Sequence, residues 1–115
     1  MDLMNKIDER VKNRLYKYLS KDKMGIRKYL LNYFLQTKSC TTVEIYNLFI
    51  KQGFNLNYRA VSAMVGHMHS RLGILSFTWT NDHNVYTLKE DYLEIVKTVM
   101  APPSRKAFLK NTDFI

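Results

Sequence analysis

A pair of histidines and a single cysteine are the residues of this sequence whose types could support metal or nucleophilic chemistry. His67 and His69 stand two positions apart, and on a helix this spacing points their side chains about 200° from each other. They cannot share one ion, so we expect no metal site. Cys40 lies beside a predicted helix start, but the sequence identifies no partner base, and we expect a semi-buried structural thiol.

The motifs that mark common enzyme active sites are not found in the sequence. It contains no Gly-rich phosphate loop, no nucleophile elbow and no carboxylate pair with catalytic spacing. We therefore expect no enzyme, no catalytic residue and no cofactor, and we identify no small-molecule effector.

The stretch NYRAVSAMVGHMHSRLG, residues 57–73, predicts a helix with small side chains on one face. Its apolar residues have the spacing of a buried seam and are Val61, Val65, Met68 and Leu72. The opposite face presents Arg59, Ser62, Ala63, Gly66 and Ser70, flanked by Tyr58, His67 and His69. Glycine inside a helix costs about 0.5–1 kcal/mol relative to alanine, so Gly66 indicates that a groove wall, a backbone or another helix approaches closely.

Positive charge is concentrated near the amino terminus. The chain has 18 Lys and Arg against 10 Asp and Glu, a net charge of +8. Residues 1–28 hold nine basic and four acidic side chains (+5), whereas residues 81–100 hold two and four (−2). This balance suits a polyanion such as nucleic acid better than a lipid surface, although a solvated helix face with surplus lysines is about as common.

The elements that carry these residues follow from periodicity and capping signals. Apolar residues recur every three to four positions over residues 3–20, which predicts an amphipathic helix. The segment IRKYLLNYFLQT is apolar nearly all round and predicts a central helix buried on more than one side. Thr41 and Glu44 then have the spacing of a capping box. Caps are also expected at Gly53, Asn57 and Gly73.

The pattern changes to a period of two after residue 73. Leu75, Phe77 and Trp79 share one face of a predicted strand, and VYTLK supplies a second strand of a β-hairpin. KEDYLEIVKTVM predicts a last helix, which the two prolines at 102–103 end. Together these elements predict a mainly α fold with a small β-hairpin, a winged helix-turn-helix with additional N- and C-terminal helices. We expect one domain over residues 1–100 and a tail, residues 101–115, that is docked or disordered.

The blocks GFNLNYRAVSAMVGHMHSRLGIL and HNVYTLKEDYLEIVK resemble a family of short archaeal winged-helix proteins recorded as a domain of unknown function. The similarity covers roughly residues 5–100. It implies the winged-helix fold and a relationship to MarR-like (multiple-antibiotic-resistance-regulator) transcription regulators, and it implies no ligand.

In a winged helix, the helix over residues 58–72 usually enters the major groove of double-stranded DNA. We therefore predict a DNA-binding protein, a transcriptional regulator. The expected contacts are Tyr58, Arg59, Ser62, Gly66, His67 and Ser70 on this helix, Asn81, His83 and Asn84 at the hairpin tip, and Arg27 and Lys28 on the second helix. Because Asp82 at the tip repels phosphate, further phosphate contacts are expected from Lys6, Arg10, Arg14 and Lys17 on the first helix.

A second interpretation is a winged helix used as a protein-interaction module in a larger nucleic-acid-processing or transcription assembly. Only Arg59 and Arg71 are charged in the predicted groove helix, fewer than a strong sequence reader usually offers. The spacing of Ser62, Gly66 and Ser70 would also let two helices touch.

The terminal helices carry more apolar residues than one core face needs, which predicts a homodimer. The expected dimer interface is formed by Leu3, Ile7, Val11, Tyr92, Ile95 and Val99. A single cysteine and an amino terminus without an apolar run predict a reduced, cytoplasmic protein, and no stretch is long enough to insert in a membrane.

Overall fold

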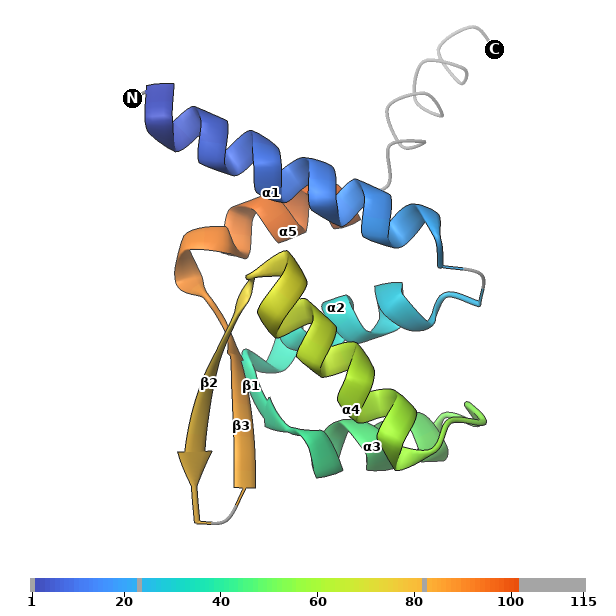
Figure 1. Cartoon of the computed structure of the whole chain (residues 1–115). Helices are drawn as coiled ribbons and strands as arrows, with labels where there is room; N and C mark the ends of the chain where they lie inside the picture. The colour runs from blue at the N-terminus through green and yellow to red at the C-terminus, as the bar shows by residue number, and fades with distance from the viewer. Residues whose placement is uncertain (1, 23, 82, 102–115) are drawn as a thin grey trace, which may run out of the picture.

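The computed structural model describes residues 2–22, 24–81 and 83–101, and for residues 2–7 it describes the backbone only. This part of the chain forms five α-helices and one three-stranded antiparallel sheet (Figure 1). The α-helices are α1 (Asp2–Ser20), α2 (Ile26–Thr37), α3 (Thr42–Lys51), α4 (Tyr58–His67) and α5 (Leu93–Met100). The strands are β1 (Ser39–Thr41), β2 (Leu75–Thr80) and β3 (His83–Leu88). None of the helices described is both long and apolar enough to cross a membrane.

The central helix α2 is buried on more than one side, as its sequence predicts. Leu30, Leu31 and Phe34 are fully buried, and α2 contacts α1, α5, β1 and β3. Helices α1 and α5 lie side by side at one end of the molecule, and the hairpin β2–β3 projects at the other (Figure 1). The core therefore fills the space between the terminal helices and the α3–α4 pair.

Side-chain caps define where α3 and α4 begin. Thr41 Oγ1 accepts a hydrogen bond from the backbone N–H of Glu44 at 3.1 Å, and Glu44 Oε1 accepts one from the N–H of Thr41 at 2.8 Å. Asn57 Oδ1 accepts from the N–H of Ala60 at 2.7 Å. Each bond satisfies a backbone donor that the first turn leaves unpaired, so the predicted capping box and N-cap are confirmed.

The sheet contains a strand that the sequence did not indicate. Strand order is β1-β3-β2, and β1 pairs with β3 from Ser39 opposite Thr87 to Thr41 opposite Val85. A strand of three residues whose last residue, Thr41, is also the helix cap is too short to display a period. The predicted hairpin is confirmed, with Leu75 opposite Leu88 and Thr80 opposite His83.

The predicted helix over residues 58–72 is α-helical only as far as His67. Residues Met68–Leu72 continue as a π-helical turn, and Gly73, at φ +69°, ends it as predicted. Both Met68 and Leu72 remain buried, so the apolar seam continues through the change of helix type. The helices, the short connection between α3 and α4, and the small sheet are compatible with the expected winged helix-turn-helix.

The apolar side chains that the structure describes on α1 and α5 are largely covered within one chain, which corrects the reasoning behind the predicted dimer interface. Val11, Ile95 and Val99 are 4%, 9% and 6% exposed, because α5 packs against both α1 and α2. Tyr92 is half-buried against the same core. The side chains of Leu3 and Ile7 lie outside the described residues. These three buried residues need no second copy to cover them, and the homodimer stays a prediction.

Replacing Gly66 by alanine should stabilise the protein. A Cβ at Gly66 meets no atom within 4 Å, so the change removes the backbone entropy of a helical glycine without a clash and should raise the free energy of unfolding by about 0.5–1 kcal/mol. Gly73→Ala is the matched control: its Cβ is equally unobstructed, but φ is +69°, and stability should fall by about 1–2 kcal/mol. Urea denaturation measures both, and destabilisation by Gly66→Ala would contradict an open helix face.

Candidate functional site

The face of α4 that points away from the core forms a shallow depression. Tyr58, Arg59, Ser62 and Ala63 line it, enclose about 410 Å³ and are all exposed. The small side chains of Ser62 and Ala63 leave the helix backbone accessible to a broad partner. Gly66 lies one turn further on and is half-buried, and its carbonyl accepts a hydrogen bond from Ser70 Oγ at 2.9 Å. The predicted small face of α4 is therefore a surface of the free chain.

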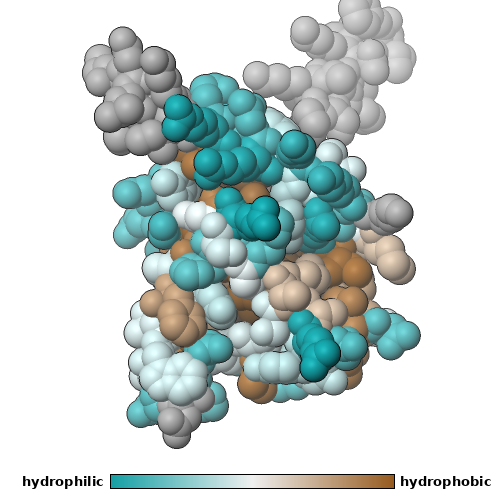
Figure 2. All heavy atoms as spheres, in the orientation of Figure 1, coloured by the Kyte–Doolittle hydropathy of each residue, from teal (hydrophilic) through white to brown (hydrophobic). Residues whose placement is uncertain are grey.

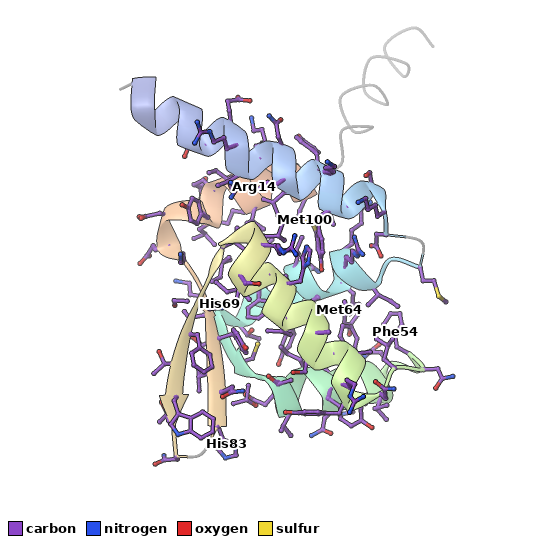
Figure 3. The ribbon with its side chains drawn as sticks, viewed as in Figure 1. Arg14, Phe54, Met64, His69, His83 and Met100 are labelled. Carbon is purple, nitrogen blue, oxygen red and sulfur yellow. The ribbon has the colours of Figure 1, made fainter. Side chains whose placement is uncertain are left out.

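The hairpin reaches the beginning of this face. A second cavity, about 220 Å³, lies between the start of α3, the start of α4 and the hairpin, and Tyr58, Trp79, His83 and Asn84 are among its lining residues. Asn81 is exposed in the turn at the hairpin tip, with φ +47°. Figure 3 places His83 at the far end of the hairpin, away from α1. Three of the residues predicted to contact DNA thus meet around one cavity, and Asn81 stands apart.

Trp79 is an exposed aromatic residue that the sequence reading assigned only to a strand face. It is 62% exposed, and Phe77 on the same face is 42% exposed, whereas Leu75 is fully buried. The hairpin projects beyond the core after its first residues, so its apolar side chains lose their cover toward the tip. The signal available in the sequence was the nearness of Trp79 to the predicted end of the hairpin.

Basic side chains from three helices converge on a cavity that we call the basic pocket. It encloses about 350 Å³ between α1, the start of α2 and the end of α4 with its π-helical turn, and its lining consists of Arg14, Lys17, Tyr18, Lys21, Arg27, His67, Arg71 and Leu72. Hydrophilic side chains gather over α1 on the side of the molecule that also shows α4 (Figure 2). Arg14, which is labelled on α1 in Figure 3, is one of these lining residues.

Tyr18 holds the pocket together. Its ring stacks on His67 with centroids 5.4 Å apart and planes 16° apart, and the Arg27 guanidinium lies 4.4 Å from its centroid. Arg27 Nη1 also donates a hydrogen bond to the Tyr18 carbonyl at 2.7 Å. These contacts fix side chains from α2 and α4 against one residue of α1, so the arrangement is ordered before any ligand arrives.

The Tyr18 hydroxyl is buried and has no hydrogen-bond partner among the described residues. Burial raises the pKa of Tyr18 to about 12; the nearby Arg27 charge opposes this shift and the Asp22 charge adds to it. The phenol therefore stays protonated at neutral pH. It can donate a hydrogen bond that no described residue accepts.

Asp22 positions the second helix at this pocket. Its two carboxylate oxygens accept hydrogen bonds from the backbone N–H groups of Arg27 and Lys28, each at 3.1 Å. The carboxylate thus caps α2 and turns Arg27 into the pocket, whereas Lys28 is exposed and does not line it. The two residues were predicted to act together, and the structure separates them.

Sequence reasoning found part of the basic pocket. Arg14 and Lys17 were expected to contact phosphate and do line it, whereas Arg10 is exposed elsewhere on α1 and the side chain of Lys6 lies outside the described residues. Four further lining residues were missed as site residues: Tyr18, Lys21, Arg71 and Leu72. They lie at the end of α1, in the turn after it and in the π-helical turn after α4, and no local spacing in the sequence relates these segments.

The two neighbouring histidines lie against different elements, as their spacing predicts. His67 faces Tyr18, whereas His69 packs near Phe77 and Tyr86 of the hairpin, at centroid distances of 6.0 and 5.9 Å. Partial burial, then the charges of Arg27, Arg71 and Lys21, lower the pKa of His67. His67 is therefore held mainly neutral near pH 7 in the free chain.

Cys40 is a structural residue of the core. It is 3% exposed on β1, and burial, followed by the Glu44 charge, raises the pKa of its thiol to about 12. A thiol that stays protonated is a poor nucleophile. The expected structural thiol is confirmed and is more deeply buried than predicted.

Removing the Tyr18 hydroxyl should not weaken the fold. A buried polar group without a partner costs about 1–3 kcal/mol, so Tyr18→Phe, which keeps the stacked ring, should raise the free energy of unfolding by about 1 kcal/mol. Tyr16→Phe is the control, because Tyr16 lies on the same helix and is 49% exposed; it should change stability by less than about 0.5 kcal/mol. If urea denaturation shows that Tyr18→Phe is clearly destabilised, the hydroxyl has a partner in the free chain.

Comparison with known proteins places the chain in a family. A family model described as a protein of unknown function, DUF2551, matches residues 15–96, which include all the lining residues of the basic pocket except Arg14. An uncharacterized protein of Archaeoglobus fulgidus is 42% identical over 90 residues, which are 78% of this chain and 92% of that protein. No solved structure matches the chain significantly. The chain therefore belongs to the DUF2551 family of proteins of unknown function.

Proposed function

We propose that this protein is a DNA-binding winged helix-turn-helix protein, a transcriptional regulator, with α4 as the helix that enters the major groove. The observation that carries the proposal is the order in which three cavities follow one another along α4. The hairpin cavity meets its first residue, Tyr58, the shallow depression follows its first two turns, and the basic pocket begins at His67. A groove-reading helix flanked by a wing and by phosphate-binding cations has this arrangement.

The chemistry along α4 suits duplex DNA. The major groove, about 12 Å wide, admits an α-helix, and the small side chains of Ser62 and Ala63 permit a close approach of the helix backbone. Arg59 is exposed in the first turn, where an arginine can bind guanine O6 and N7 or a phosphate. Ser62 can hydrogen-bond a base edge or a phosphate oxygen.

The topology supports the same proposal. The chain runs through α2, β1, α3, α4 and the hairpin, and β1 pairs with the edge of β3 that β2 leaves free. A winged helix-turn-helix has a small sheet of this kind beside two successive helices that are joined by a short connection. In such a fold the second helix of that pair is the one that contacts DNA.

A protein-interaction module is the alternative, and one observation favours it. Trp79 and Phe77 are exposed on the hairpin, and large exposed aromatic residues are enriched at the centres of protein interfaces. A wing that contacts phosphates would more usually present lysine or arginine. The two functions differ in their dependence on salt, which the following experiment measures.

Binding to a nonspecific DNA duplex should be micromolar or tighter at low salt and should weaken steeply as salt rises. Each phosphate contacted releases condensed counterions, so the logarithm of affinity should fall with the logarithm of salt concentration with a slope of about −0.9 per phosphate. Fluorescence anisotropy with a labelled duplex measures this slope. If no binding is measurable at low salt, the DNA proposal is wrong and the interaction module is favoured.

The role of α4 can be separated from general charge. Arg59→Ala should weaken DNA binding by about 1–3 kcal/mol and relax the preference at one base position if Arg59 contacts a base, or weaken all sequences alike if it contacts phosphate. Lys97→Ala is the control: it removes the same charge from α5, where Lys97 already pairs with Glu94 at 3.4 Å, and should leave affinity nearly unchanged. Equal losses of affinity from both variants would contradict the proposal that α4 enters the groove.

A further inference from the structure

We propose that the basic pocket between α1, α2 and α4 is a binding site for a phosphate-type oxyanion. The source of the phosphate is either a free phosphorylated small molecule or the backbone of a nucleic acid, and both present the same oxygen atoms. The proposal does not require that α4 reads DNA, because the pocket is lined by a different set of residues from the depression at Arg59.

The basic pocket carries positive charge that no carboxylate in its lining balances. Five cationic side chains line the pocket, together with His67, and no carboxylate is among the lining residues. Among the residues that the structure describes, the ion pair found within 4 Å joins Glu94 and Lys97 on α5. Like charges gathered in one cavity repel one another, and a bound anion relieves that repulsion.

Asp22 lies in a cavity that shares Lys21 and Arg27 with the basic pocket, and its position leaves the pocket basic. Both of its oxygens accept backbone N–H groups of α2 at 3.1 Å. It lines a neighbouring cavity with Lys21, Met24 and Arg27 rather than the basic pocket itself. Its charge is therefore engaged at the start of α2 and does not occupy the place of an anion in the pocket.

Preorganised donors are the second argument. Arg27 is held by its hydrogen bond to the Tyr18 carbonyl and by the Tyr18 ring, and an arginine has five N–H donors in a fixed plane. Most of these donors stay available for an oxyanion. Tyr18, which is 6% exposed, also lines the pocket, and the stack of its ring on His67 holds the imidazole in place.

The volume of the pocket limits the size of the ligand. At about 350 Å³ it lies at the lower end of the range of about 300–1,000 Å³ that small-molecule sites occupy. Donors on three sides suit a group with several charged oxygens better than a single carboxylate. We therefore choose pyrophosphate as the probe.

His67 provides a reporter inside the site. Its imidazole faces Tyr18 from α1, Arg27 from α2, Lys21 from the turn after α1 and Arg71 from its own helix, and Arg14 and Lys17 complete the lining. Burial and those cations lower its pKa in the free chain. A bound anion should reverse the effect of the cations, so binding should raise the pKa of His67.

The test is calorimetric titration of the full chain with pyrophosphate, with NMR of the His67 ring as a second readout. We expect saturable binding of one pyrophosphate per chain and a rise in the pKa of His67. Arg14→Gln combined with Arg71→Gln should weaken binding at least about tenfold, because each arginine loses a charged hydrogen bond. Both residues are exposed, so the fold should survive, and Lys17→Gln with Lys21→Gln gives a second variant of the same kind.

Lys51→Gln with Lys97→Gln is the matched control, because it removes two exposed positive charges outside the pocket and should leave pyrophosphate affinity unchanged. Non-saturating titration, or equal weakening by the pocket pair and the control pair, would overturn the proposal. An unchanged pKa of His67 at saturating pyrophosphate would overturn it as well.

A duplex titration of the same variants distinguishes the two sources of phosphate. If pyrophosphate competes with the duplex and the pocket variants weaken binding to every duplex sequence alike, the ligand is a backbone phosphate. If pyrophosphate binds and the pocket variants keep full duplex affinity, or if the wild-type chain binds no duplex, the ligand is a free phosphorylated molecule. All three outcomes support the pocket. Only the absence of duplex binding by the wild-type chain also contradicts the DNA function.

Discussion

The burial of α2 on more than one side is the constraint on which the rest of the structure depends. Leu30, Leu31 and Phe34 are removed from water, which requires neighbours on opposite sides of one helix. The chain supplies them from both ends, with α1 and α5 on one side and the sheet on another. Because α5 must reach α2, it also covers the apolar face of α1, and the terminal helices become part of a single core.

That packing brings the end of α1 to the place where the candidate site forms. Tyr18 belongs to the core through its buried ring, yet the same ring contacts Arg27 and His67. Asp22 closes the turn by accepting the backbone N–H groups of Arg27 and Lys28 in the first turn of α2. One buried aromatic residue and one capping carboxylate therefore connect the stability of the fold to the position of the basic side chains.

The exposed face of α4 depends on the core in a different way. Its buried seam, Val61 and Val65, fixes how the helix is rotated, and this rotation leaves Arg59, Ser62 and Ala63 toward solvent. The seam continues through the π-helical turn, which keeps Met68 and Leu72 buried and directs Arg71 toward the basic pocket. A surface of small residues and a pocket of cations thus follow one another along the same helix.

The sequence by itself determined the elements whose signals are local. The capping box of Thr41 and Glu44, the cap at Asn57 and the apolar seam of α4 act within one or two helical turns, so spacing alone identifies them. Only the tertiary structure decided that β1 pairs with β3, that Ile95 and Val99 are buried against other helices, and that side chains from residue 14 to residue 71 share one pocket. Those outcomes depend on how helices and strands distant in the sequence cross and pack, and no local spacing contains that information.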